Sequence, residues 1–311
     1  MTAPFLRLEP ARSVRTDVLD VAYVEAGPED GPVTLLLHGF PYDIHSYVDV
    51  LPLLTRAGHR VIVPYLRGHG PTRFLDDTTE RSGQQAALGA DVIGLMDALN
   101  IPQAILARFD WGGRAACVAA ALWPERCTAL VTVNSYLIQD IRRAMTPIRP
   151  DLEAGLWYFF YFLTERGRAG LTANRREVAR VIWTRNSPQW SFDDAVFERA
   201  AAAFDNPDYV DVVIHSYRHR LGAAPGAPRY EGLEARLAAL PPITVPAVTL
   251  DGLADGNFPA TDGRPSAAQF AGPRMHHQVP SAGHNLPQEV PHAFARAILE
   301  AADLRRYALG D

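Results

Sequence analysis

Short, continuous apolar runs alternate with helical patterns through the first part of the chain. Residues 82–99 place apolar side chains at helical spacing, and an alanine-rich segment over 113–123 also predicts a helix. Four apolar runs bounded by turn residues resemble strands that are buried on both faces. They are Val33–Leu37, Arg60–Val63, Ala104–Ala107 and Ala129–Val133. This alternation predicts an α/β fold whose mostly parallel central sheet is flanked by helices.

The alternation stops after Asn134. Residues 135 to 221 contain no convincing strand, but they carry several amphipathic helical patterns. We expect Ser191 to cap one of these helices with its hydroxyl, and Asn206 followed by Pro207 to begin another. This stretch is therefore predicted to be all helical.

Strand and helix patterns then return towards the C-terminus, over 245–250, 275–279 and 291–302. The simplest arrangement is one α/β core domain interrupted by a helical insertion. We expect residues 1–134 and 226–311 to form the core domain, and residues 135–225 to form a helical cap domain.

The charged residues of the chain exclude several classes of reaction and partner. It has 311 residues with 30 basic and 35 acidic side chains, a net charge of −5, and every basic residue is arginine. The absence of lysine excludes imine chemistry and a phosphate-binding loop lysine, and arginine is a poor general base. Without a basic run, neither nucleic acid nor a membrane surface is expected as a partner.

Cofactor and metal chemistry also lack a sequence signal. Cys117 and Cys127 both lie in apolar surroundings, and the sequence contains no cluster of cysteine and histidine. We therefore expect neither a cofactor nor a metal. The N-terminus has no signal-peptide pattern, and the apolar run over 156–163 is far shorter than the roughly 20 residues that cross a bilayer. A cytoplasmic protein is expected.

Three polar motifs follow predicted strands. Asp110 comes directly after the third of the four runs and is followed by Trp111 and two glycines, which predicts a nucleophile on a sharp turn from strand to helix. The unpaired N–H groups of such a helix start favour a carboxylate. Asp255 follows the strand at 245–250, and His284 follows the strand at 275–279. The chain order is thus nucleophile, acid, histidine.

With the motifs HGFP, DWGG, GLAD and GHN, the chain resembles the α/β-hydrolase superfamily. Within it, the chain is similar to the branch of epoxide hydrolases and haloalkane or haloacid dehalogenases, which carry a helical cap after the sixth core strand. The resemblance implies Asp110 as nucleophile, His284 as base and Asp255 as its orienting acid. It also implies an oxyanion hole formed by the backbone N–H groups of Phe40 and Trp111.

An aspartate nucleophile favours displacement at a saturated carbon, because its attack on an ester would form a high-energy anhydride. The expected reaction is a hydrolysis that passes through a covalent alkyl ester on Asp110. His284 would then deprotonate the water that attacks this ester.

Epoxide hydrolases and dehalogenases differ in the leaving group of the first step. Epoxide hydrolases resemble one another in two cap tyrosines that protonate the opening epoxide. The resemblance implies this role for Tyr158 and Tyr217, with Tyr161 as a substitute for Tyr158. His38 and Trp157 are expected to bind the substrate. We expect a vicinal diol as product and a small apolar or aromatic substrate, with a homodimer as a further expectation.

Two alternatives remain open. Fluoroacetate-type dehalogenases resemble this chain in Arg114, which there holds the substrate carboxylate, and Trp111 could bind a halide. Arg108 stands where a nucleophile elbow normally has a small residue. If that side chain displaces Asp110, the protein would be a non-hydrolytic or specialised relative.

Overall fold

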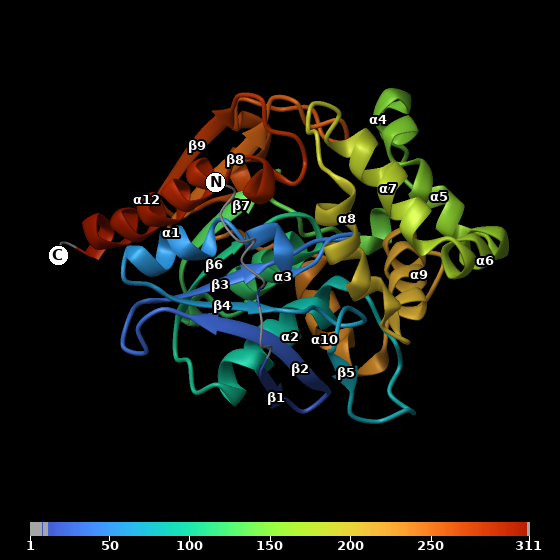
Figure 1. The fold of residues 1–311 in the computed structure, drawn as a ribbon, viewed down its shortest axis with the longest axis horizontal. Helices are drawn as coiled ribbons and strands as arrows, with labels where there is room; N and C mark the ends of the chain where they lie inside the picture. The colour runs from blue at the N-terminus through green and yellow to red at the C-terminus, as the bar shows by residue number, and fades with distance from the viewer. Residues whose placement is uncertain (1–7, 9–11, 310–311) are drawn as a thin grey trace.

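A nine-stranded sheet forms the centre of the computed structural model, which describes Leu8 and residues 12–309 (Figure 1). The strand order is β1-β2-β4-β3-β6-β7-β8-β9, and the short β5 pairs with β2. Pairing is parallel from β4 through β9 and antiparallel among β1, β2, β4 and β5. The strands are β1 (Arg12–Arg15), β2 (Leu19–Ala26), β3 (Val33–Leu37), β4 (Arg60–Pro64), β5 (Arg73–Phe74), β6 (Ala104–Arg108), β7 (Cys127–Val133), β8 (Ala247–Gly252) and β9 (Arg274–Val279).

The predicted parallel strands are confirmed as β3, β4, β6, β7, β8 and β9, with ends shifted by up to two residues. Nearly every side chain of β6 and β7 is buried, as expected for strands covered on both faces. The sequence analysis did not identify β1 and β2. The β1 edge strand is mostly exposed, and β2 mixes acidic with apolar residues, so neither has the continuous apolar run of a parallel strand.

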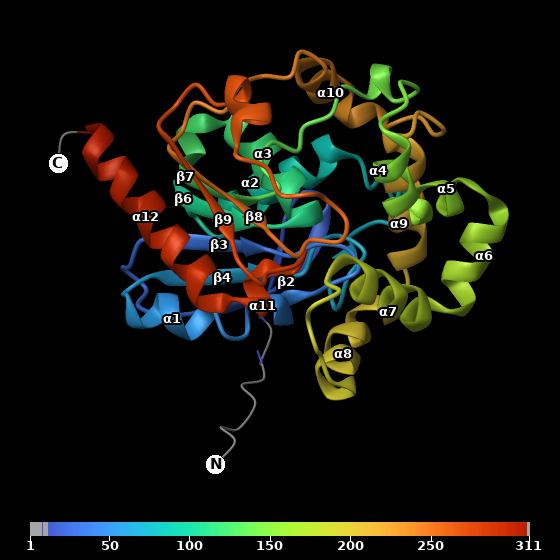
Figure 2. The ribbon, with the colours of Figure 1, turned by 90° about the horizontal axis from the view of Figure 1, so that it is seen from above.

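Helices cover both faces of the sheet, as predicted (Figure 2). Helices α1 (Leu51–Arg56) and α12 (Pro291–Leu309) contact each other and one face. Helices α2 (Gln85–Ala98) and α3 (Asp110–Leu122) pack together on the opposite face, where α10 (Glu231–Leu237) contacts α2. Within the described chain, no helix is both long and apolar enough to span a membrane.

A second group of helices lies between β7 and β8 in the chain and to one side of the sheet (Figure 1, green to gold). If the two-residue β5 is left out, this cap follows the sixth strand, as expected. Its helices are α4 (Pro150–Gly155), α5 (Trp157–Leu163), α6 (Glu165–Ala173), α7 (Arg175–Asn186), α8 (Asp194–Ala201) and α9 (Tyr209–Arg220).

The helix starts in the cap differ from those predicted. Asp193, rather than Ser191, caps α8, because its carboxylate accepts a hydrogen bond from the Val196 N–H at 2.7 Å. The Asn206 side-chain oxygen accepts the Asp208 N–H at 2.8 Å just before α9, which begins three residues after Asn206. Its amide nitrogen donates to the carbonyl oxygens of Gly70 and Thr72 at 2.9 and 2.7 Å. Asn206 therefore anchors the cap to the core loop that follows β4.

Candidate active site

The turn between β6 and α3 presents the Asp110 carboxylate. Asp110 has a φ of +50°, a left-handed conformation that is uncommon for a residue with a side chain. Gly112 allows this close turn, since a Cβ there would lie 2.1 Å from the Leu37 carbonyl oxygen. The backbone N–H groups of Phe40 and Trp111 each donate to Asp110 Oδ1 at 2.7 Å. These are the two donors expected to form an oxyanion hole.

His284 joins the two aspartates. Its Nε2 lies 3.3 Å from Asp110 Oδ2, and its Nδ1 lies 2.9 Å from Asp255 Oδ2. The other Asp255 oxygen accepts hydrogen bonds from the N–H groups of Asn257 and Phe258 at 2.8 and 2.9 Å. Asp255 is thus held by its own loop and fixes the imidazole.

The charges of His284 and Asp110 shift each other's pKa. Burial favours the neutral imidazole of His284, but Asp255 and Asp110 outweigh burial and raise its pKa to about 10. Burial also opposes ionisation of Asp110, but contact with His284 and the N–H groups of Phe40 and Trp111 lowers its pKa below the usual value. Asp110 is therefore a carboxylate that needs no separate base.

A small cavity of about 110 Å³ opens onto this carboxylate. Core and cap both line it, and its walls combine polar and aromatic groups. The lining residues are Asp110, Trp111, Arg114, Asn134, Leu137, Leu156, Tyr158, Phe159, Arg220, Phe258 and His284. The Asp110 carboxylate and the His284 imidazole thus both line one small cavity.

Both predicted tyrosines are buried beside this cavity. The Tyr158 hydroxyl accepts a hydrogen bond from Asn257 Nδ2 at 3.4 Å, and the Tyr217 hydroxyl accepts one from Trp111 Nε1 at 3.2 Å. The two rings lie edge to face with their centroids 5.5 Å apart. Burial, together with the Asp110 charge, raises both pKa values above the usual tyrosine value, so both hydroxyls keep their protons.

Three residues expected to contact the substrate do not line this cavity. The Nδ1 of His38 bonds the Gly39 carbonyl oxygen at 2.9 Å and its Nε2 accepts the Leu66 N–H at 3.1 Å, so His38 holds the loop that carries the oxyanion donor. Burial lowers its pKa to about 3. The rings of Trp157 and Tyr161 lie 5.8 Å apart on another face of α5 and do not line the cavity.

The sequence analysis missed several lining residues. Asn134 donates from its side chain to Asp255 Oδ2 at 3.2 Å, and Phe258 lies 5.9 Å from the His284 ring, centroid to centroid. Arg220 lies three residues after Tyr217, and this spacing places both on one side of α9. That helical spacing was the available signal for Arg220. Asn134 also had a signal, because it is a polar residue directly after β7, whereas Phe258 lies in a loop and had none.

Arg108 does not displace Asp110 from the turn between β6 and α3. Its buried guanidinium extends beneath α3, where it donates to the carbonyl oxygens of Val133 and Ser135 at 3.2 and 2.8 Å and to Cys117 Sγ at 2.8 Å. Gly113 leaves the necessary room, since a Cβ there would lie 2.3 Å from an Arg108 nitrogen. The possible displacement of Asp110 is therefore not seen; instead the charge of Arg108 is buried, and its Nε has no hydrogen-bond partner among the described residues.

Replacement of Arg108 should affect stability rather than the site. Arg108→Gly is expected to lower the free energy of unfolding by about 2–4 kcal/mol, because it opens a cavity and removes three donors from buried acceptors. Urea unfolding would measure this loss, with the exposed Arg166→Gly as the control. A variant as stable as the parent would show that the unpaired charge of Arg108 costs as much as its contacts contribute.

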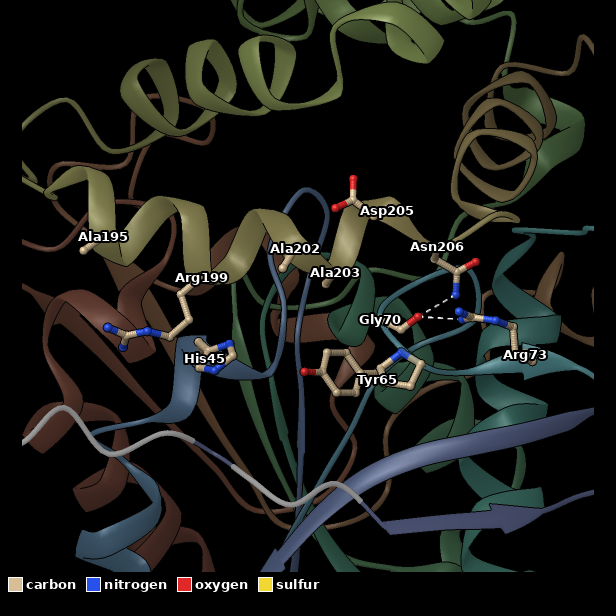
Figure 3. A pocket seen from close by; sticks show the side chains of 11 residues that line it. His45, Tyr65, Gly70, Arg73, Ala195, Arg199, Ala202, Ala203, Asp205 and Asn206 are labelled. Carbon is tan, nitrogen blue, oxygen red and sulfur yellow. Dashed lines mark hydrogen bonds between the residues drawn. The ribbon is translucent and has the colours of Figure 1, made fainter.

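A larger hollow of about 830 Å³ lies between the cap and the core but outside this constellation (Figure 3). Arg199 and Asn206 face it from the cap side, and His45 and Tyr65 from the core side. It contains none of the residues around Asp110. The candidate site is therefore the smaller cavity.

Comparison with known proteins identifies the class that this fold and site define. A family model described as the alpha/beta hydrolase fold matches residues 32–286, and the chain belongs to this family. A candidate epoxide hydrolase from Klebsiella pneumoniae subsp. pneumoniae has a crystal structure that is 50% identical, with a TM-score of 0.92 over 94% of this chain and 97% of that one.

Two curated relatives refine the class. Epoxide hydrolase A of Mycobacterium tuberculosis is 28% identical over 96% of this chain and 98% of its own length. A haloalkane dehalogenase of Mycolicibacterium paratuberculosis is 34% identical over 41% of this chain and 42% of its own. The chain is thus a hydrolase of the α/β-hydrolase family, in the branch that the sequence resembled.

Proposed function

We propose that the protein hydrolyses an epoxide to a vicinal diol through a covalent ester on Asp110. The observation that carries this proposal is the hydroxyl of Tyr158 in the cavity with Asp110. That hydroxyl accepts a hydrogen bond from Asn257, so its own proton is free for a ligand. An opening epoxide needs such a proton, because its leaving group is an alkoxide.

The first step forms the ester. Asp110 Oδ2 attacks a ring carbon, the carbon–oxygen bond of the epoxide breaks, and the electron pair goes to the ring oxygen. Tyr158, assisted by Tyr217, protonates that oxygen. Asp110 Oδ1 remains in its two N–H contacts, which hold the carboxylate in place.

The second step cleaves the ester. Esterification removes the charge of Asp110, which lowers the pKa of His284, so the imidazolium releases its proton to solvent and the neutral imidazole can take a proton from water. The resulting hydroxide attacks Asp110 Cγ, and the oxyanion forms on Oδ1, facing Phe40 and Trp111. Collapse expels the diol oxygen, which takes the proton from His284, and the remaining water proton returns to the tyrosine. His284 regains a proton from solvent once Asp110 is ionised again.

Tyr158→Phe should lower kcat for epoxides by about 100-fold, because the alkoxide loses its proton donor. Tyr217→Phe should have a smaller effect, about 10-fold, because Tyr217 is not among the residues that line the cavity. Tyr161→Phe, on the same helix but outside the cavity, is the matched control. Diol formation from aryl, alkyl and carboxylated epoxides, followed by chromatography, gives the measurement.

The alternative function, a dehalogenase, is tested by adding haloacids to the same panel of substrates. In a dehalogenase the indole N–H of Trp111 would hold the halide, yet here that N–H donates to Tyr217. Halide release from haloacids, combined with no diol from any epoxide, would contradict the proposal. It would establish the dehalogenase instead, and loss of the Tyr158 hydroxyl would then have little effect because a halide needs no proton.

A further inference from the structure

The end of the cap helix α7 lies between the two loops that carry Asp255 and His284. The carbonyl oxygen of Asn186, the last residue of α7, accepts the N–H of Gly256 at 2.9 Å and that of His284 at 3.3 Å. The first of these N–H groups directly follows Asp255 in the chain, and the second belongs to His284 itself. One buried carbonyl group of the cap therefore joins both loops.

Ser187, the next residue, places its hydroxyl against the backbone of His284. Its Oγ accepts the His284 N–H at 3.1 Å and donates to Glu289 Oε1 at 2.7 Å. Glu289 ends the short helix α11 (Leu286–Glu289), and its Oε2 accepts the Gly283 N–H at 2.7 Å. A hydroxyl that donates to a carboxylate becomes a better acceptor, so this chain of hydrogen bonds holds the backbone of His284 more firmly than the serine would alone.

Both loops meet the end of α7 through a glycine at close range. A Cβ added at Gly283 would lie 2.7 Å from the Cα of Ser187, which is only 1% exposed. A Cβ added at Gly256 would lie 2.0 Å from the carbonyl oxygen of Arg185, the residue before Asn186. A shift of this end of α7 would therefore move both loops.

Ser216 provides a comparison within the same cap. It is also 1% exposed and lies against a core glycine, since a Cβ added at Gly83 would be 2.7 Å from the Ser216 Cβ. The Ser216 hydroxyl has no hydrogen-bond partner in the part of the chain that the structure describes. Of these two buried cap serines, Ser187 is thus the one whose hydroxyl is bonded to His284.

We infer that Ser187 and Glu289 are positioning residues for His284, through which the cap sets the geometry of ester cleavage. This inference rests on the proposed function, in which His284 acts as a base in that step alone. Its Nδ1 must stay at Asp255 while its Nε2 reaches the attacking water, and a misplacement of about 1 Å can cost on the order of 100-fold in rate. Attack by Asp110 on the substrate needs no such alignment, so the two steps should respond differently.

Single-turnover kinetics of Ser187→Ala test the inference. With the protein in excess, loss of epoxide reports ester formation and release of diol reports ester cleavage. Ester formation should stay within about 2-fold of the parent, whereas ester cleavage should slow by about 10-fold, so that intact mass spectrometry detects the ester. Ser216→Ala is the matched control and should leave both rates at parental values. Melting curves would verify that both variants are folded.

Glu289→Gln gives a second test in which the serine is retained. The amide has one acceptor oxygen in place of two, so it keeps only one of the hydrogen bonds from Ser187 and Gly283. Ester cleavage should slow by roughly 3-fold, and the double variant should be no slower than Ser187→Ala, because both changes break the same chain of hydrogen bonds. Independent effects that multiply, or an equal slowing of both steps, would overturn the inference and leave Ser187 with a role in stability alone.

NMR titration of His284 separates this inference from the proposed function, because it needs no substrate. Asp255 and Asp110 raise the pKa of His284 to about 10, and a displaced imidazole should have a lower pKa in Ser187→Ala but not in Ser216→Ala. A lower His284 pKa in Ser187→Ala, combined with no diol from the parent, would retain the positioning role and overturn the proposed function. Diol formation by the parent, with a parental pKa and parental rates in Ser187→Ala, would overturn the positioning role alone.

Discussion

Asp110→Asn is expected to lower kcat for epoxide hydrolysis by at least about 10³-fold. The amide is a poor nucleophile, and without the ester the oxyanion donors and His284 have no intermediate to act on. Steady-state diol formation measures this loss. Asp251→Asn is the matched control, because Asp251 is also buried at the end of β8 but accepts hydrogen bonds only from Thr261.

The same variant has a second readout. Removal of the Asp110 charge should lower the pKa of His284 from its raised value of about 10. NMR titration of the imidazole would follow this change. Near-parental turnover in Asp110→Asn would contradict the role of Asp110, whereas lost turnover with an unchanged His284 pKa would contradict the coupling of the two groups.

His284→Gln should separate the two steps. Glutamine does not activate water as a base, but Asp110 remains ionised and able to attack. The ester should therefore accumulate, with one burst of epoxide consumption per protein molecule and a kcat at least about 10³-fold below the parent. Intact mass spectrometry should find a protein heavier by the mass of one substrate, and peptide mapping should place the addition on Asp110.

His277→Gln provides the control for this experiment, since His277 lies on β9 and pairs with Glu300 away from the cavity. A complementary measurement uses the parent protein in heavy-oxygen water under single-turnover conditions. The covalent route puts the label into Asp110, because the water oxygen enters the carboxylate. Label that enters only the diol would show direct attack of water on the epoxide and would overturn the ester.

Much of the fold could be predicted from local patterns of apolar and polar residues in the sequence. Buried parallel strands are continuous apolar runs, so the strands that precede Phe40, Asp110, Asp255 and His284 were recognisable. Polar residues directly after such strands meet at one edge of the sheet. The antiparallel strand β1 escaped prediction because it is mostly exposed, and β2 escaped because acidic residues interrupt its apolar run although most of its side chains are buried.

The outcome at Arg108 required the packed structure. Sequence alone shows a large cation where a small residue is usual, and it left a displaced Asp110 as one possible consequence. The direction of the side chain depends on space beneath α3, which Gly113 provides, and on carbonyl acceptors from the loop after β7. Those acceptors lie some 25 residues away in the chain.

The sequence by itself determined the fold class, the order of Asp110, Asp255 and His284, and the class of reaction, because strand ends and short motifs are local features. Only the tertiary structure decided which cap side chains face Asp110. It placed Tyr158 and Arg220 in the cavity and turned Trp157 away. The physical reason is that a helix rich in aromatic residues on every side does not specify its own rotation, so packing against neighbouring helices and the core fixes which residues meet the ligand.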